Sequence, residues 1–119
     1  MAERNAVDRG VLDQLRHSTG GDPAFLAELI DTYLDDSAGL LASIRQAIAE
    51  PNAPELRRAA HSLKSNSASF GAGPLASLCR ELELRARDGR LDGAREQLAQ
   101  IEAAYAEVER ELRALRPRT

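Results

Sequence analysis

The sequence predicts an all-α protein, an antiparallel up-down four-helix bundle with a short additional N-terminal helix that covers one end. Alanine and leucine together supply 38 of the 119 residues, whereas valine, isoleucine and threonine supply 10. Because alanine and leucine lose little side-chain freedom in a helix, this ratio favours helices over strands. Apolar residues recur three and four positions apart, and the five prolines fall between such segments or at their starts. A chain of this length suits a single domain, residues 1–119.

The first two helices are predicted from capping residues and apolar spacing. Asp8 has the chemistry of an N-cap for a short helix over residues 8–18, and two glycines follow that helix. Asp22, followed by a proline, opens a long helix over residues 23–50. The apolar stripe of this helix is broad, which predicts burial against more than one neighbour. The stripe comprises Phe25, Leu26, Leu29, Ile30, Tyr33, Leu34, Leu41, Ile44 and Ile48.

Three further helices are predicted over residues 53–70, 74–88 and 92–116. Asn52 and Glu55 have the spacing of a capping box at the start of the first of them. The last has the most regular apolar spacing, so a dimerising coiled coil is an alternative interpretation of it. Its heptads are few and their flanking positions lack a consistent charge pattern. We therefore expect it to pack within the bundle of a monomer.

Composition excludes several classes of protein. A net charge of −3 and only four aromatic residues disfavour nucleic-acid binding, which needs a basic stripe and stacking side chains. No stretch has the length and apolarity of a membrane span, and the N-terminus has no apolar leader, so we expect a cytoplasmic protein. The single cysteine, Cys79, cannot form an internal disulfide and lies in phase with core leucines. Met1 and the charged tail over residues 116–119 favour a stand-alone protein.

His61 is the candidate functional residue because it lies on the polar face of its helix. At about 100° per residue, the apolar residues of helix 53–70 cluster on one side and His61 points away from them. An exposed histidine on a helix is commonly an ordinary surface residue, but the neighbours of His61 favour a function. Those on the same face are Arg57, Lys64, Ser65 and Ala68.

These neighbours suit the chemistry of phosphoryl transfer. Lys64 is the only lysine in a chain with fifteen arginines, and its compact, mobile ammonium suits a phosphoryl group that arrives and leaves. Ser65 and Ala68 are small, so they leave the imidazole open to the active site of another protein. A neutral imidazole is a competent nucleophile, and a nearby cation balances the charge of a group that it accepts.

The segment around His61 resembles a family signature. Residues 60–72, A-H-S-L-K-S-N-S-A-S-F-G-A, resemble the motif of histidine-containing phosphotransfer (HPt) domains, usually written H-x-L-K-G-S-S with Gly-Ala a few residues on. The resemblance extends to residues 12–15, 21–23, 57–60 and 78–83, and so covers nearly the whole chain. It implies a four-helix bundle in which His61 accepts a phosphoryl group from an aspartate of one receiver domain and passes it to another.

The resemblance also implies roles for individual residues. Lys64 stands at the position of the family's phosphate-contacting lysine, and Glu83 and Arg87 would lie near the imidazole or the docked partner. Ser65 stands where the family usually has glycine, which predicts looser or more selective docking. The docking residues implied in this way are Arg57, Ser65, Ala68, Glu83 and Arg87.

The sequence lacks the motifs of a self-sufficient enzyme. It has no P-loop or glycine-rich phosphate loop, and no Glu-x-x-His pairs for a di-metal bundle. We therefore expect a stoichiometric carrier without a cofactor or metal of its own, and we expect the Mg²⁺ in the receiver domain. The alternative is a structural helical adaptor that binds signalling partners without transferring phosphate, because such a protein would have nearly the same core pattern.

Two other polar residues are expected to be structural. His17 falls near the end of the first helix, where a cation interacts favourably with the helix dipole. Ser67 lies on the apolar face of helix 53–70, where we expect its hydroxyl to bond back to the carbonyl of Leu63.

Overall fold

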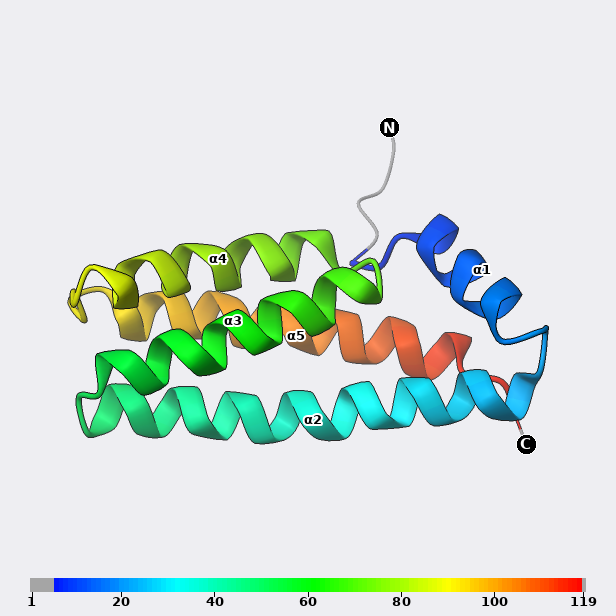
Figure 1. Ribbon diagram of the computed structural model, residues 1–119, viewed down its shortest axis with the longest axis horizontal. Helices are drawn as coiled ribbons and strands as arrows, with labels where there is room; N and C mark the ends of the chain where they lie inside the picture. The colour runs from blue at the N-terminus through cyan, green and yellow to red at the C-terminus, as the bar shows by residue number, and fades with distance from the viewer. Residues whose placement is uncertain (1–5, 119) are drawn as a thin grey trace.

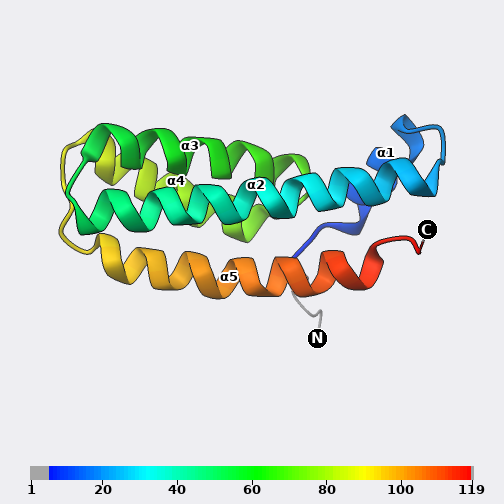
Figure 2. The same ribbon diagram turned by 90° about the horizontal axis from the view of Figure 1, so that it is seen from below.

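The computed structural model describes residues 6–118, and this part of the chain contains five helices (Figure 1). They are α1 (Arg9–Ser18), α2 (Pro23–Ala49), α3 (Ala53–Ser69), α4 (Gly73–Arg87) and α5 (Ala94–Leu115). Helices α2 to α5 run alternately in opposite directions, and α1 lies over the end of the bundle at which α2 begins (Figures 1 and 2). The predicted fold class is confirmed. No helix within this range is long and apolar enough to cross a membrane.

Helix starts follow local capping chemistry. The side chains of Asp8 and Asp22 each accept a hydrogen bond from the amide two residues later, at 2.8 and 3.0 Å, and Asn52 accepts one from the amide three residues later at 3.1 Å. These bonds satisfy amides that have no partner within the helix. α5 begins at Ala94, slightly later than the sequence suggests, because Gly93 adopts a left-handed conformation with φ of 78°.

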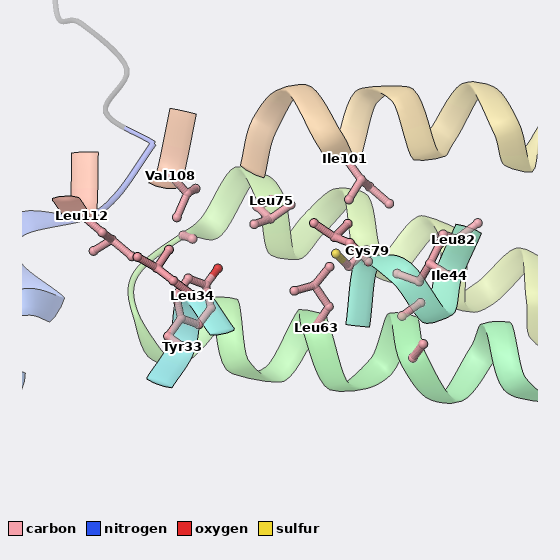
Figure 3. Close-up of a cluster of buried hydrophobic side chains, with 14 of the residues drawn as sticks. Tyr33, Leu34, Ile44, Leu63, Leu75, Cys79, Leu82, Ile101, Val108 and Leu112 are labelled. Carbon is pink, nitrogen blue, oxygen red and sulfur yellow. The ribbon is translucent and has the colours of Figure 1, made fainter. Parts of the chain in front are cut away.

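Side chains from all four long helices meet in one core (Figure 3). The fully buried large residues include Ile30, Ile44, Leu56, Leu63, Leu75, Leu82, Ile101 and Leu112. Cys79 lies among them, and burial raises the pKa of its thiol to about 12. The thiol therefore stays protonated at neutral pH and serves as a small apolar side chain.

Two predicted details of the core are wrong. Phe25 is 49% exposed, because it is out of phase with the buried residues Leu26 and Ile30. Ser67 is buried, but its hydroxyl lies 2.8 Å from the hydroxyl of Tyr33 on α2 and forms a hydrogen bond with it. The partner of the Ser67 hydroxyl is therefore Tyr33 and not the Leu63 carbonyl. The buried phenol of Tyr33 needs a polar partner, and Ser67 provides one from the facing helix.

The segment before α1 ties together parts of the bundle that are distant in sequence. The Glu111 carboxylate of α5 accepts hydrogen bonds from the amides of Ala6 at 2.8 Å and Val7 at 3.1 Å, and Val7 is fully buried. The Asp8 amide donates to the carbonyl of Gly71, in the α3–α4 turn, at 2.9 Å. Gly71 has φ of 75°, and a side chain there would lie 3.0 Å from the Asp8 carbonyl oxygen. Glycine is therefore needed for this close approach.

Replacing Glu111 tests the contribution of this segment. Glu111→Ala leaves two amides without their acceptor, so we expect the free energy of unfolding to fall by about 1–3 kcal/mol. Glu107→Ala, one turn earlier on α5, removes only an exposed ion pair to Arg110 and should cost less than about 1 kcal/mol. Urea unfolding followed by circular dichroism measures both values. Equal losses in the two variants would contradict the assigned role of Glu111.

Candidate functional site

The candidate site lies on the outer surface of the bundle, where α3 runs beside α4. α3 directs Leu56, Ala59, Ala60, Leu63 and Ser67 into the core. His61 lies on the opposite side of the helix, and its side chain is 58% exposed. The exposure predicted for this imidazole is therefore observed.

Glu83 on α4 binds both His61 and Lys64. One carboxylate oxygen, Oε2, lies 2.8 Å from His61 Nδ1, and the other, Oε1, accepts a hydrogen bond from Lys64 Nζ at 2.6 Å. The Glu83 side chain is only 15% exposed and that of Lys64 is 27% exposed. Packing between α3 and α4 thus holds the carboxylate and the ammonium, while the imidazole above them remains open to solvent.

The ionisation of Glu83 determines the tautomer of His61. Burial raises the pKa of the Glu83 carboxyl, but the hydrogen bonds from Lys64 and His61 outweigh this effect and hold the pKa below its ordinary value. The group is therefore an ionised carboxylate at neutral pH, and a carboxylate only accepts hydrogen bonds. Nδ1 of His61 must then be the protonated ring nitrogen, which leaves the lone pair of a neutral imidazole on Nε2.

Access to the imidazole depends on small neighbours. Ser65 and Ala68 follow His61 by one and two turns of α3, and both are exposed. The Ser65 carbonyl accepts a hydrogen bond from the Ser69 hydroxyl at 3.1 Å, a contact on the same solvent-exposed stretch of α3. At these two positions the side chains of α3 are therefore too small to cover the imidazole of His61.

The two predicted docking arginines do not contact the imidazole. Arg57 lies one turn before His61 on α3 and is exposed. Arg87 lies one turn after Glu83 on α4, and its guanidinium forms an ion pair with the adjacent Asp88 at 3.5 Å. Both arginines lie at the edge of the site and extend into solvent.

The buried pair of Tyr33 and Ser67 was not predicted, although it lies on the inner side of the helix that carries His61. The Tyr33 ring stacks on Phe70 with centroids 4.7 Å apart, and its hydroxyl bonds to Ser67. This arrangement fixes the C-terminal half of α3 against α2. The sequence does offer one indication of this pair. Tyr33 lies among the apolar residues of the long helix, and a buried phenol needs a hydrogen-bond partner on a neighbouring element.

Within residues 6–118, the His, Cys, Asp and Glu side chains form no group of three or more that is arranged to hold a metal ion. Glu83 is the only carboxylate hydrogen-bonded to His61 in that range, and it is already occupied by Lys64.

The comparisons with known proteins agree with the helical-bundle fold. The family model described as "Hpt domain" matches residues 28–111. The crystal structure of histidine-containing phosphotransfer protein B (HptB) from Pseudomonas aeruginosa PAO1 is similar, with a TM-score of 0.89, 33% identity and coverage of 96% of each chain. No curated protein sequence matches. The chain belongs to the Hpt domain family, as its sequence indicates.

A second solved structure shows how widely the fold is shared. The histidine-containing phosphotransfer protein ZmHP2 from maize superposes with a TM-score of 0.79 over 92% of this chain and 86% of its own. Its identity to this chain is 23%, so this likeness shows the fold alone.

The pairing of Glu83 predicts a specific pH dependence of stability. The pKa of Glu83 is lower in the folded protein than in the unfolded chain. The ionised carboxylate therefore stabilises the fold at pH values above the unfolded pKa, and this stabilisation is lost as the pH falls through the folded pKa. Glu83→Gln should therefore reduce the free energy of unfolding by about 1 kcal/mol at neutral pH and by much less near pH ~3. Urea unfolding at both pH values provides the measurement.

The matched control is Glu81→Gln, an exposed position two residues earlier on α4. It should change stability little at either pH. A stability loss in Glu83→Gln of the same size at both pH values would show that the carboxylate is not the stabilising group.

Proposed function

We propose that this protein carries a phosphoryl group on His61 within a phosphorelay. It accepts the group from the aspartyl phosphate of one receiver domain and passes it to an aspartate of another. The observation that carries the proposal is the bond between Glu83 and Nδ1 of His61, which in a neutral ring leaves the lone pair on Nε2 of a side chain that is 58% exposed. Membership of the Hpt domain family supports the same function.

The proposed transfer exchanges one bond to phosphorus for another. The lone pair of Nε2 forms the N–P bond while the P–O bond to the aspartyl carboxylate breaks, and the leaving carboxylate keeps that electron pair. No base has to remove a proton, because Nε2 carries none in this tautomer. The ring gains positive charge as the N–P bond forms, and the Glu83 carboxylate stabilises that charge through the Nδ1 proton. Transfer to the second receiver reverses these steps.

Lys64 is the cation that we assign to the phosphoryl group. Its ammonium and the imidazole share the carboxylate of Glu83, so both lie within one small cluster. A lysine side chain has a flexible stem, and the ammonium can turn from Glu83 toward phosphoryl oxygens when the group is present. It then offsets part of the negative charge that His61 gains.

The receiver domain would dock over the exposed faces of α3 and α4 and would supply the acidic pocket and the Mg²⁺. In this proposal Ser65 and Ala68 form the part of the surface nearest the imidazole, and Arg57, Glu83 and Arg87 surround it. This chain contributes a nucleophile on a rigid helix and no nucleotide site of its own. It is therefore a stoichiometric carrier.

We further propose that the carrier acts as a monomer in the cytoplasm. Within the described residues, Phe25 is the one large apolar side chain that is exposed, so these residues present no broad apolar face of the kind that stable dimers bury. The buried thiol of Cys79 is compatible with a reducing compartment.

Replacement of each histidine in turn by glutamine tests whether His61 is the phosphoryl acceptor. Incubation of the wild-type chain with a phosphorylated receiver domain should give label that is labile in acid and stable in alkali. His61→Gln should abolish this label while retaining the helical circular dichroism spectrum, because glutamine lacks the nucleophilic imidazole. His17→Gln, which removes the other histidine of the chain, should label like the wild type.

Label that persists in His61→Gln would refute the assignment. A wild-type chain that binds receiver domains but takes no label from any of them would favour the structural adaptor.

Replacement of Lys64 tests the role of its charge. Lys64→Ala should slow phosphoryl transfer by roughly tenfold or more, because the phosphoryl group loses its nearby cation. The melting temperature should fall by no more than about 5 °C, since the ion pair with Glu83 is only partly buried. Rapid-quench transfer kinetics and thermal unfolding provide the two values. Unchanged transfer, or a loss of rate explained entirely by unfolding, would contradict the role of Lys64.

A further inference from the structure

α3 packs against both α2 and α4, and side-chain hydrogen bonds join it to each of these helices. Toward α4, His61 and Lys64 bind the carboxylate of Glu83. Toward α2, the buried hydroxyl of Ser67 shares a hydrogen bond of 2.8 Å with the hydroxyl of Tyr33. Within residues 6–118, this is the one side-chain hydrogen bond between α2 and α3. Any directional hold of α2 on the helix that carries the imidazole therefore depends on Tyr33.

Tyr33 reaches into the core from α2 and contacts α3 at two residues (Figure 3). Its hydroxyl binds Ser67, and its ring stacks on Phe70 with the centroids 4.7 Å apart. Ser67 and Phe70 are three residues apart, so they lie on the same side of α3. Burial raises the pKa of the Tyr33 phenol, so its hydroxyl keeps its proton at neutral pH. The contact between Tyr33 and Ser67 is thus a bond between two neutral hydroxyl groups.

This bond restricts α3 in a way that apolar packing does not. The burial of a side chain such as Leu63 is favourable in any direction, so it tolerates small rotations of the helix about its axis. A hydrogen bond requires a particular length and angle. An imidazole atom lies about 6 Å from the helix axis, so a rotation of about 10° would move it by about 1 Å. Such a movement would break the 2.8 Å bond between His61 and Glu83.

We propose that Tyr33 is a positioning residue for phosphoryl transfer, because its bond to Ser67 fixes the rotation of α3 and thereby keeps His61 bonded to Glu83. The inference rests on the carrier function proposed above and adds Tyr33 and Ser67 to the residues on which transfer depends. Both are buried, so neither touches the phosphoryl group. They act through the orientation of the imidazole, and a displacement of about 1 Å can slow a reaction by up to about 100-fold.

A purely structural role for Tyr33 makes a different prediction. Tyr33→Phe leaves the hydroxyl of Ser67 buried without its partner, which lowers stability whichever role is correct. The double variant Tyr33→Phe with Ser67→Ala has neither hydroxyl, so no polar group of this pair remains unbonded and most of the stability returns. If the pair serves only stability, phosphoryl transfer should recover with it. If the pair positions His61, transfer should remain slow.

The matched control is Tyr105→Phe, which removes the hydroxyl of the other tyrosine in the chain. That hydroxyl donates to the carbonyl of Leu34 at 3.3 Å, so it joins α5 to α2 and leaves α3 untouched. Two-bond ¹H–¹⁵N correlation NMR at about pH 8, where the imidazole is neutral, gives the tautomer of His61. Phosphoramidate is the phosphoryl donor for the rate. Its P–N bond breaks and ammonia leaves as Nε2 bonds to phosphorus.

We expect Tyr33→Phe and Ser67→Ala to populate both tautomers of His61 and to take label about tenfold more slowly than the wild type. The melting temperature of each should fall by about 5 °C. The double variant should melt within about 3 °C of the wild type and still take label about tenfold more slowly. Tyr105→Phe should retain the single tautomer, protonated at Nδ1, and the wild-type rate.

Three results would overturn the inference. Tyr33→Phe could keep the single tautomer and the wild-type rate, the double variant could recover its rate together with its melting temperature, or Tyr105→Phe could lose the tautomer as fully as Tyr33→Phe. Ser67→Ala breaks the same bond from α3, so it decides the question if Tyr33→Phe does not fold. The carrier function fails differently, with a wild-type chain that takes label from phosphoramidate but from no phosphorylated receiver domain.

Discussion

The carboxylate of Glu83 is the group on which the arrangement of the site depends. It lies between α3 and α4 and binds the imidazole through one oxygen and the ammonium of Lys64 through the other. An ionised carboxylate only accepts hydrogen bonds, so the nitrogen of His61 that is bonded to it, Nδ1, must carry a proton. This bond therefore determines the tautomer of the neutral ring. One interaction thus orients the ring, exposes Nε2 and keeps a cation beside the nucleophile.

The rest of the fold keeps α3 and α4 in the register that this interaction needs. The helices pack closely through buried residues such as Leu63 and Cys79. In the turn between them, the Gly71 carbonyl accepts a hydrogen bond from the Asp8 amide, which holds the turn in place. A shift of one residue along either helix would displace Glu83 relative to His61 by about 1.5 Å and change their relative orientation by about 100°, which would break the bond between them. Tight packing of the core is therefore a condition for the chemistry at the surface.

The sequence predicts much of this molecule because most of its structure follows local rules. Helical periodicity and capping residues such as Asp22 are properties of neighbouring positions, and the exposure of His61 follows from the phase of one helix. Contacts between distant segments do not follow from such patterns. The bond of Glu83 to Nδ1, the partnership of Tyr33 with Ser67, and the Glu111 carboxylate bound to the amides before α1 depend on how helices are packed in three dimensions.

The most direct test of the account is two-bond ¹H–¹⁵N correlation NMR of the His61 imidazole in the unphosphorylated protein. The account predicts that the neutral ring is protonated at Nδ1 and unprotonated at Nε2. It also predicts that Glu83→Ala, which removes the acceptor, loses this single tautomer, whereas Glu81→Ala retains it. A neutral ring protonated mainly at Nε2 in the wild-type protein would contradict the account, because the nitrogen that faces solvent would then have no lone pair to offer.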